Sequence, residues 1–192
     1  PVRIYDGENI PFSDGEFDVV FSSNVLEHVK VPERLLSEVK RVLKTHGCLV
    51  IVVPTGSWRL WSILSTIING CKQLIASILS EMYHRFIVKD FTKEMAKQYR
   101  EHKRLAIRRI ISLPPAHGEI GNCISEIRLF WKSRWERLFR KTGYIIRVYQ
   151  TNKLFYSGGT CIPVLGLRQR KRLSTLLGSA CHIFILETGS DK

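Results

Sequence analysis

Several polar residues of this chain are of types that bind ligands or move protons. Asp6 and Gly7 close a short β-branched and aromatic run, where a carboxylate can accept a hydrogen bond and a backbone amide can donate one. The same pair is a common turn, which is the alternative interpretation. Glu27 and His28 stand together farther along the chain, and histidine changes its protonation state near neutral pH. His28 is therefore a candidate general base, with a structural hydrogen bond inside its own loop as the alternative.

A second polar group lies on a stiff segment. Pro114 and Pro115 disfavour helix, so His117 and Glu119 project from a loop. Polar residues on such loops are candidates for substrate contact. A connector between two helices, with solvated side chains, fits the same pattern. We take His117 and Glu119 as candidate substrate-contacting residues.

Strands and helices must position these residues. Residues 17–22 and 48–53 are continuous apolar runs, typical of strands covered on both faces. Between them, residues 32–44 carry apolar side chains at helical spacing, with proline in the first turn and lysine near the end. This order predicts a parallel βαβ unit, so the fold class is α/β. A helix over 125–142 and later strands at 144–149 and 182–186 complete the pattern.

The stretch from Tyr5 to Pro54 resembles a known family. It contains D-G, then I-P-F, F-D-V-V-F-S-S-N-V-L-E-H, and R-V-L-K-T-H-G before the second apolar strand. The resemblance is to class I S-adenosylmethionine-dependent methyltransferases of type 11, the group with the ubiquinone and menaquinone biosynthesis enzymes. That group shows an acidic residue after its third strand, then L-P-F, F-D, L-E-H or L-H-H, and R-x-L-K-P-G-G. About fifty of the 192 residues carry the match.

The resemblance implies a Rossmann-like, mostly parallel sheet flanked by helices, with S-adenosyl-L-methionine as the cofactor. It implies that Asp6 and Gly7 pair with the adenine of that cofactor. His28 would then take a proton from an acceptor hydroxyl. The residues that close the next strand would face the methionine part of the cofactor or, alternatively, cap the following segment: Ser22, Ser23 and Asn24.

We expect no metal site. In some relatives an E-x-x-E-H run binds a divalent metal, and here Asn24 stands in place of the first carboxylate. The five cysteines are odd in number, widely spaced and without a CxxC pair, which indicates reduced thiols in a cytosolic protein and disfavours zinc. They are Cys48, Cys71, Cys123, Cys161 and Cys181.

The family's glycine-rich turn and the acidic residue that holds the ribose are absent from this sequence. In the family's strand order 3-2-1-4-5-7-6, residues 1–56 would supply strands 3, 4 and 5, beginning with Val2–Tyr5. Residues 57–124 would form a helical insertion or substrate cover, and 125–192 the final helix and strands 6 and 7. We therefore expect an N-terminally truncated part of an enzyme, inactive alone, in which strand 3 loses its neighbours.

Residues 58–79 read as an amphipathic helix with too many polar residues for a convincing membrane span. Basic residues follow at Lys97–Arg109 and at Arg168–Arg172. We expect a lid packed on its own domain in a cytoplasmic protein. The alternative, to which the two basic runs beside an apolar helix point, is peripheral contact with the anionic inner face of a membrane.

The chain carries a net charge of +13, which attracts nucleic acid, anionic membranes or acidic metabolites. No aromatic residues alternate with the basic runs as stacking platforms, so nucleic acid is disfavoured. We expect methyl transfer to a small-molecule or lipid-linked acceptor, with oxygen slightly favoured. An RNA methyltransferase and a non-catalytic binding module of the same fold are the alternatives.

Overall fold

The structure, a computed structural model, describes residues 3–5, 9–156 and 165–189. The chain divides into two units. The sheet unit comprises residues 1–59, 116–155 and 166–192, and the hairpin unit comprises residues 60–115 and 156–165.

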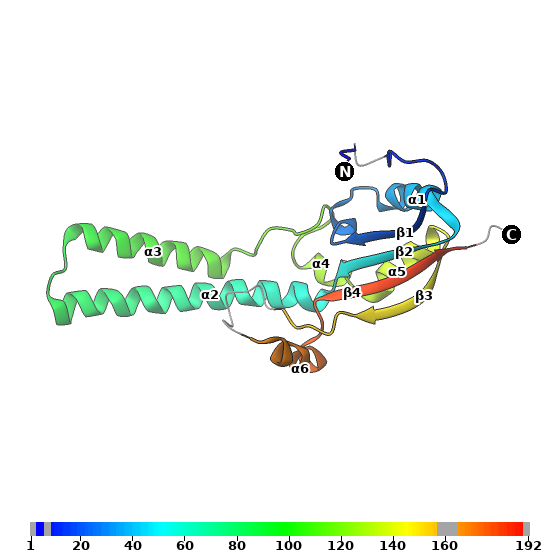
Figure 1. Ribbon diagram of the computed structural model, residues 1–192. Helices are drawn as coiled ribbons and strands as arrows, with labels where there is room; N and C mark the ends of the chain where they lie inside the picture. Colours follow the sequence, from blue (N-terminus) through cyan, green and yellow to red (C-terminus); the bar gives the residue numbers. More distant parts are fainter. Residues whose placement is uncertain (1–2, 6–8, 157–164, 190–192) are drawn as a thin grey trace. The chain divides into compact units, whose positions relative to one another are not determined.

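The described strands of the sheet unit form one mixed sheet in the order β1-β2-β4-β3 (Figure 1). β1 (Phe17–Ser23) pairs parallel with β2 (Leu43–Pro54). β4 (Cys181–Thr188) pairs antiparallel with both β2 and β3 (Tyr144–Thr151). β1, β2 and β3 therefore point the same way, although only the β1–β2 ladder is parallel. The expected Rossmann-like α/β fold class is confirmed, with one strand reversed.

Helices cover this sheet with their apolar faces. α1 (Pro32–Val42) starts on a proline, whose fixed backbone angle suits the first helical turn. It buries Leu36 and Val39 in the same core as Leu49 of β2. α5 (Lys132–Lys141) adds Phe139, whose ring meets Phe184 of β4 edge-on at 5.1 Å. This core fixes the strand ends that carry the polar residues.

The strand expected at Val2–Tyr5 is wrong for the part that the structure describes. Arg3–Tyr5 form no strand, and Ile4 is 95% exposed. A strand needs a neighbour to pair with its backbone groups. None of the described strands pairs with this segment. Val2 lies outside the described residues.

The helix expected over 125–142 is broken in two. α4 (Ser125–Leu129) ends at Phe130, and the extended backbone of Trp131 precedes α5. The break brings Phe130 into the core, where it stacks on Trp135 at 6.2 Å between ring centroids, and leaves Trp131 exposed. A single helix over 125–142 would place Phe130 and Trp131 on neighbouring positions of one surface, and the turn between α4 and α5 separates them instead.

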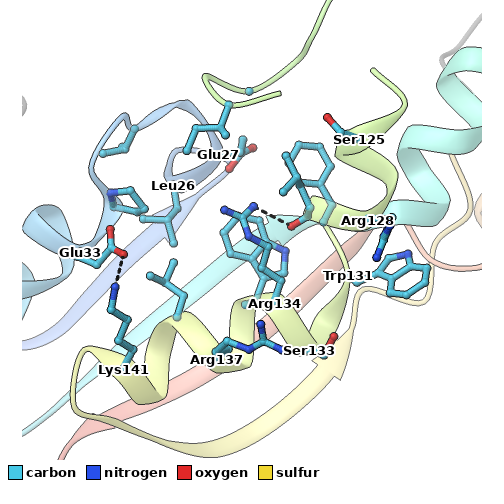
Figure 2. A pocket seen from close by; sticks show the side chains of 18 of the residues that line it. Leu26, Glu27, Glu33, Ser125, Arg128, Trp131, Ser133, Arg134, Arg137 and Lys141 are labelled. Atoms are coloured by element: carbon cyan, nitrogen blue, oxygen red, sulfur yellow. Dashed lines mark hydrogen bonds and ion pairs between the residues drawn. The ribbon is translucent and has the colours of Figure 1, made fainter. Parts of the chain in front are cut away.

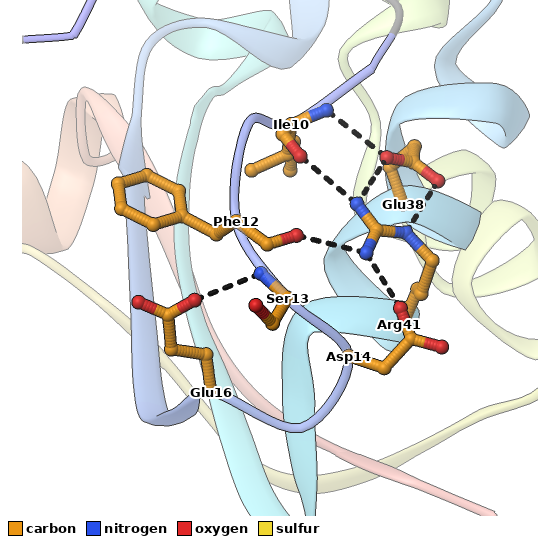
Figure 3. A network of polar contacts seen from close by, with 7 residues as sticks. All are labelled: Ile10, Phe12, Ser13, Asp14, Glu16, Glu38 and Arg41. Atoms are coloured by element: carbon orange, nitrogen blue, oxygen red, sulfur yellow. Dashed lines mark hydrogen bonds and ion pairs between the residues drawn. The ribbon is translucent and has the colours of Figure 1, made fainter.

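One arginine fastens the segment before β1 to α1 (Figure 3). Arg41 donates through Nη1 to the Phe12 carbonyl at 2.9 Å and to Asp14 Oδ1 at 2.7 Å. Its Nη2 donates to the Ile10 carbonyl at 2.9 Å and to Glu38 Oε2 at 2.8 Å. The planar guanidinium suits several acceptors at once. The loop that follows the candidate adenine contacts is therefore held on α1.

The hairpin unit is built from two antiparallel helices. α2 (Gly56–Met82) starts in the sheet unit and continues into a π-helical turn, Tyr83–Val88, and α3 (Lys93–Ile111) returns alongside it. Lys103 Nζ lies 2.6 Å from Glu81 Oε2, and Arg109 donates to Gln73 Oε1 at 2.7 Å. These contacts join the two helices at points far apart along their length.

One described helical stretch, Gly56–Val88, is long and apolar enough to cross a membrane by length and composition. Only 17% of its most apolar window is buried. The last helix, α6 (Leu167–Leu177), belongs to the sheet unit and carries the basic run Arg168–Arg172.

Candidate functional site

The polar residues that follow β1 are tied to the end of β2. Ser22 and Ser23 close β1, and Asn24 follows with a left-handed backbone, φ 51°. Asparagine adopts this region more readily than most residues do. The Asn24 amide donates to the Val52 carbonyl of β2 at 2.9 Å, and its side chain donates to Ser23 Oγ at 3.3 Å. These residues therefore lie at the carboxyl ends of two parallel strands, where α/β proteins bind ligands.

A single 3₁₀ turn, Leu26–His28, then directs Glu27 into the protein. The Glu27 side chain has no exposed area, and neither of its carboxylate oxygens has a hydrogen-bond partner among the described residues. Burial raises the pKa of Glu27, opposed in part by its own backbone hydrogen bond and by the nearby His28. An ionised carboxylate in such a place requires a compensating positive charge.

Two imidazoles lie beside this carboxylate. Nε2 of His28 and Nε2 of His117 are each 3.9 Å from Glu27 Oε1. The His117 ring lies between the rings of His28 and Trp58, with its centroid 4.7 Å from each. Burial lowers the pKa of His117, and the charge of His28 lowers it further. The site thus brings together residues separated by about ninety positions in the sequence.

A buried ion pair holds the loop that carries His117. Glu126 Oε1 accepts from the backbone amides of His117 and Gly118, both at 2.6 Å. Glu126 Oε2 lies 2.7 Å from Arg59 Nε, and both side chains are almost completely buried. Charged acceptors bind amides more strongly than neutral ones do. The His117 loop is therefore fixed through its backbone.

The same loop touches the turn of Glu27 directly. The Glu119 amide donates to the Glu27 carbonyl at 3.0 Å. A Cβ atom at Gly118 would lie 2.6 Å from that carbonyl oxygen, so only glycine permits this approach. The loop that carries His117 and the turn that carries Glu27 are therefore in direct backbone contact next to the two imidazoles.

A pocket of about 770 Å³ opens beside Glu27 (Figure 2). It lies between the turn after β1 and the helices α4 and α5, and Leu26, Leu129 and Leu138 form part of its apolar wall. Basic side chains predominate among its charged lining residues: Lys30, Arg128, Arg134, Arg137 and Lys141. Glu33, paired with Lys141 at 3.2 Å, and Glu27 are the acidic lining residues. Such a pocket suits a molecule with an apolar body and a negative group.

Glu27, His28 and His117 can also hold a cation. Each offers one ligand atom, and the three atoms lie within 4.8 Å of one another. Carboxylate oxygen and imidazole nitrogen are ligands that divalent transition metals accept. We expected no metal site because Asn24 stands in place of a carboxylate in the local run. His117, which completes the group of three ligands, comes from a distant loop.

The structure places the expected site residues as follows. It brings His28 and His117 together, and Glu119 reaches the same place through its backbone. Ser22, Ser23 and Asn24 lie at the strand end described above. Asp6 and Gly7 lie outside the described residues, so their expected adenine contact remains a prediction.

Sequence reasoning missed the supports of the site, Arg59 and Glu126, and the neighbouring Trp58. A charged residue next to the apolar face of a helix was the available signal for Glu126. That signal is weak, because most such residues are solvated.

The first part of the chain is similar to known proteins. Residues 1–51 match the family described as "Methyltransferase domain". An uncharacterised protein of Methanocaldococcus jannaschii is 44% identical over 50 residues, which are 26% of this chain and 24% of that protein. An uncharacterised methyltransferase of Mycobacterium sp. (strain KMS) is 49% identical over 45 residues, 23% of this chain and 18% of that protein. The matched segment thus spans about a quarter or less of these relatives.

A solved structure is similar over nearly the whole chain. It is the complex between the Haloferax volcanii Trm112 methyltransferase activator and a methyltransferase. The similarity has a TM-score of 0.50 at 11% identity and covers 98% of this chain and 60% of the other. At this identity the similarity concerns the fold, and it agrees with the mixed sheet described above.

Proposed function

We propose that this chain, which belongs to the class I S-adenosylmethionine-dependent methyltransferases, is part of an enzyme that methylates a small-molecule or lipid-linked acceptor. S-adenosyl-L-methionine is the methyl donor of this family. The matched residues 1–51 include β1, the turn that follows it and most of β2.

One observation carries the proposal. Glu27, His28 and His117 gather at the carboxyl end of β1, beside a pocket large enough for an acceptor. Ligands of open α/β sheets bind at this edge. Ser22, Ser23 and Asn24 end the same strand and would face the methionine part of the cofactor. Asp6 and Gly7, farther upstream, would pair with its adenine.

The pocket supports an acceptor with a negative group and an apolar body. Its basic lining would bind phosphate or carboxylate, and its leucines would contact a hydrocarbon portion. Lipid-linked molecules and acidic metabolites both have this character. Acceptor oxygen is favoured because His28, near the expected position of the methyl group, can take a proton from a hydroxyl.

A divalent cation is an alternative chemistry for the same three residues. The two buried carboxylate oxygens of Glu27, without partners among the described residues, favour it. A cation there would supply the missing positive charge and polarise an acceptor oxygen. The cofactor proposal is the same in both cases.

Calorimetric titration of the whole protein with S-adenosyl-L-methionine tests the proposal. Loss of a hydrogen bond that leaves a polar group unsatisfied costs about 1–3 kcal/mol, so Asp6→Ala should weaken binding about five- to a hundredfold. Asp18→Ala, which removes the surface pair with Lys44, is the control and should bind normally. If the whole protein does not bind the cofactor, the proposal is wrong.

A further inference from the structure

The end of the helical hairpin, where α2 turns into α3, exposes a group of large apolar side chains. We call residues 79–91 the hairpin tip. Phe86 and Ile87, both in the π-helical turn, are 65% and 69% exposed. The other exposed apolar residues of the tip are Leu79, Met82, Tyr83 and Val88. Soluble proteins expose single apolar residues everywhere, but a contiguous group at the end of a hairpin indicates a binding surface.

Positive charge accompanies this apolar group. Residues 60–115 hold ten lysines and arginines against four aspartates and glutamates, a net charge of +6. Residues 79–97, the tip and the first turns of α3, carry +1 of it, from four basic and three acidic residues. Lys89 lies in the tip, and Lys93 and Lys97 follow on the first turns of α3. Two of the three acidic residues nearby are already paired: Glu81 with Lys103 at 2.6 Å and Arg85 at 3.2 Å, and Asp90 with His84 at 2.9 Å. The partner of this surface should therefore be apolar and negatively charged.

The helix cannot cross a bilayer as a separate span while the hairpin is intact. α2 is bound to α3 along its length by the Gln73–Arg109 and Glu81–Lys103 contacts. At Gly70 a Cβ atom would lie 2.8 Å from Ile110 Cγ1, which shows how closely the helices approach. A spanning α2 would draw the many charges of α3 into hydrocarbon, which is strongly unfavourable. Among the described residues of the hairpin unit, those of the tip can enter a bilayer surface without drawing the rest of α3 into it.

We propose that the hairpin tip inserts into the surface of an anionic lipid bilayer. Phe86, Ile87 and their neighbours would enter the boundary between headgroups and acyl chains, about 5–10 Å deep. Lys89, Lys93 and Lys97 would meet the phosphates of the same leaflet. This inference does not depend on the proposed function, since it uses residues of the hairpin unit alone.

Vesicle co-sedimentation of the full chain tests the proposal. One set of vesicles contains phosphatidylcholine alone, and the other contains phosphatidylcholine mixed with phosphatidylglycerol. The protein should bind the mixed vesicles and bind the neutral ones at least about tenfold more weakly. Added salt should weaken binding to the mixed vesicles without abolishing it, because it screens the lysines and leaves the apolar contact intact.

Two variants separate the apolar and charged contributions. Phe86→Ser combined with Ile87→Ser should lower affinity for mixed vesicles at least about tenfold, because two apolar side chains no longer enter the bilayer. Lys93→Glu combined with Lys97→Glu should remove the preference for anionic lipid. Leu176→Ser is the matched control, since Leu176 is 84% exposed but lies on α6 in the sheet unit.

Three outcomes would overturn the proposal. The first is absence of binding to mixed vesicles. The second is a loss of binding in Leu176→Ser equal to that in the tip variant. The third is a tip variant that keeps its vesicle affinity but no longer self-associates in sedimentation velocity, which would assign the tip to contact between two copies of the chain.

Discussion

Arg59 and Glu126 form an ion pair, 2.7 Å from Nε to Oε2, between side chains that are 5% and 0% exposed. The other carboxylate oxygen of Glu126 accepts from two consecutive backbone amides, those of His117 and Gly118. The buried Glu126 carboxylate thus pairs with the Arg59 guanidinium and also fixes the loop that brings His117 to Glu27. The stability of the sheet unit and the geometry of the candidate site depend on the same carboxylate.

Replacing Glu126 should therefore destabilise the protein strongly. Glu126→Gln breaks the buried ion pair with the Arg59 guanidinium, and breaking such a pair typically costs about 3–5 kcal/mol in the free energy of unfolding. Urea unfolding followed by circular dichroism measures it. Glu136→Gln, which breaks the Lys132–Glu136 pair at the surface, should cost less than about 1 kcal/mol. Equal losses in the two variants would contradict a special role for Glu126.

His28→Ala should lower turnover of the whole enzyme by about 10²–10⁴ while leaving affinity for S-adenosyl-L-methionine unchanged. The reason is that a general base, the role proposed for His28, acts in the transition state and not in cofactor binding. Initial rates with the acceptor, combined with calorimetry of the cofactor, measure the two quantities. His46→Ala, an exposed histidine on β2, is the control. If the variant turns over as fast as the unmodified protein, His28 is not a general base. The site would then contribute to catalysis mainly by positioning the acceptor.

Divalent cations should change the fluorescence of Trp58, whose ring lies 4.7 Å from that of His117. Titration with Co²⁺ should give a saturable decrease, because the bound ion would lie at the imidazole that contacts the indole. Glu27→Gln and His117→Ala should each abolish the effect, whereas His46→Ala should retain it. A response that persists in Glu27→Gln would place the ion elsewhere and exclude the cation chemistry proposed for these three residues.

His182 should make stability depend on pH. Burial lowers its pKa from the ordinary value of 6.5, only partly offset by its hydrogen bond to the Phe130 carbonyl, and Tyr149 Oη lies 3.0 Å from its Nδ1. Between the lowered pKa and 6.5 the unfolded chain binds a proton that the native protein does not bind. The free energy of unfolding should therefore rise with pH through this window and fall as the pH drops below about 6.5.

The difference between His182→Gln and the unmodified protein measures this contribution. Urea unfolding across pH 5 to 8, in steps of about half a unit, should show a shallower slope below about 6.5 in the variant. His46→Gln, on an exposed histidine, should keep the original slope. An unchanged slope in His182→Gln would mean that other groups produce the dependence.

The sequence predicted most of the sheet unit because its apolar runs are long and regular. The helix that starts at Pro32 forms as expected and buries Leu36 and Val39. Phe17–Ser23 also forms a strand, but the expectation that it is covered on both faces is wrong, because Val19 and Phe21 are exposed. The break between α4 and α5 could not be predicted. Phe130 and Trp131 are both apolar, and only the tertiary packing decides that Phe130 enters the core and Trp131 does not.

The candidate site was predictable residue by residue but not as an arrangement. His28 and His117 were both chosen from their types and their surroundings. Their contact depends on the Glu126 carboxylate, which has only a weak local sequence signal, and on the close approach at Gly118, which has none. The hairpin tip was missed for another reason. Its apolar residues follow the amphipathic stretch that ends at Leu79, and exposure at a helix turn is a property of the fold.

The outer edge of β1 determines how readily the isolated chain associates with further copies of itself in solution. No strand of the described residues pairs with that edge, and Val19 and Phe21 are exposed along β1. An edge of this kind is a template for further backbone pairing, so concentrated solutions of the isolated chain should form β-rich assemblies. Handling conditions that slow strand addition, such as low protein concentration, are therefore a practical requirement for every measurement on this chain.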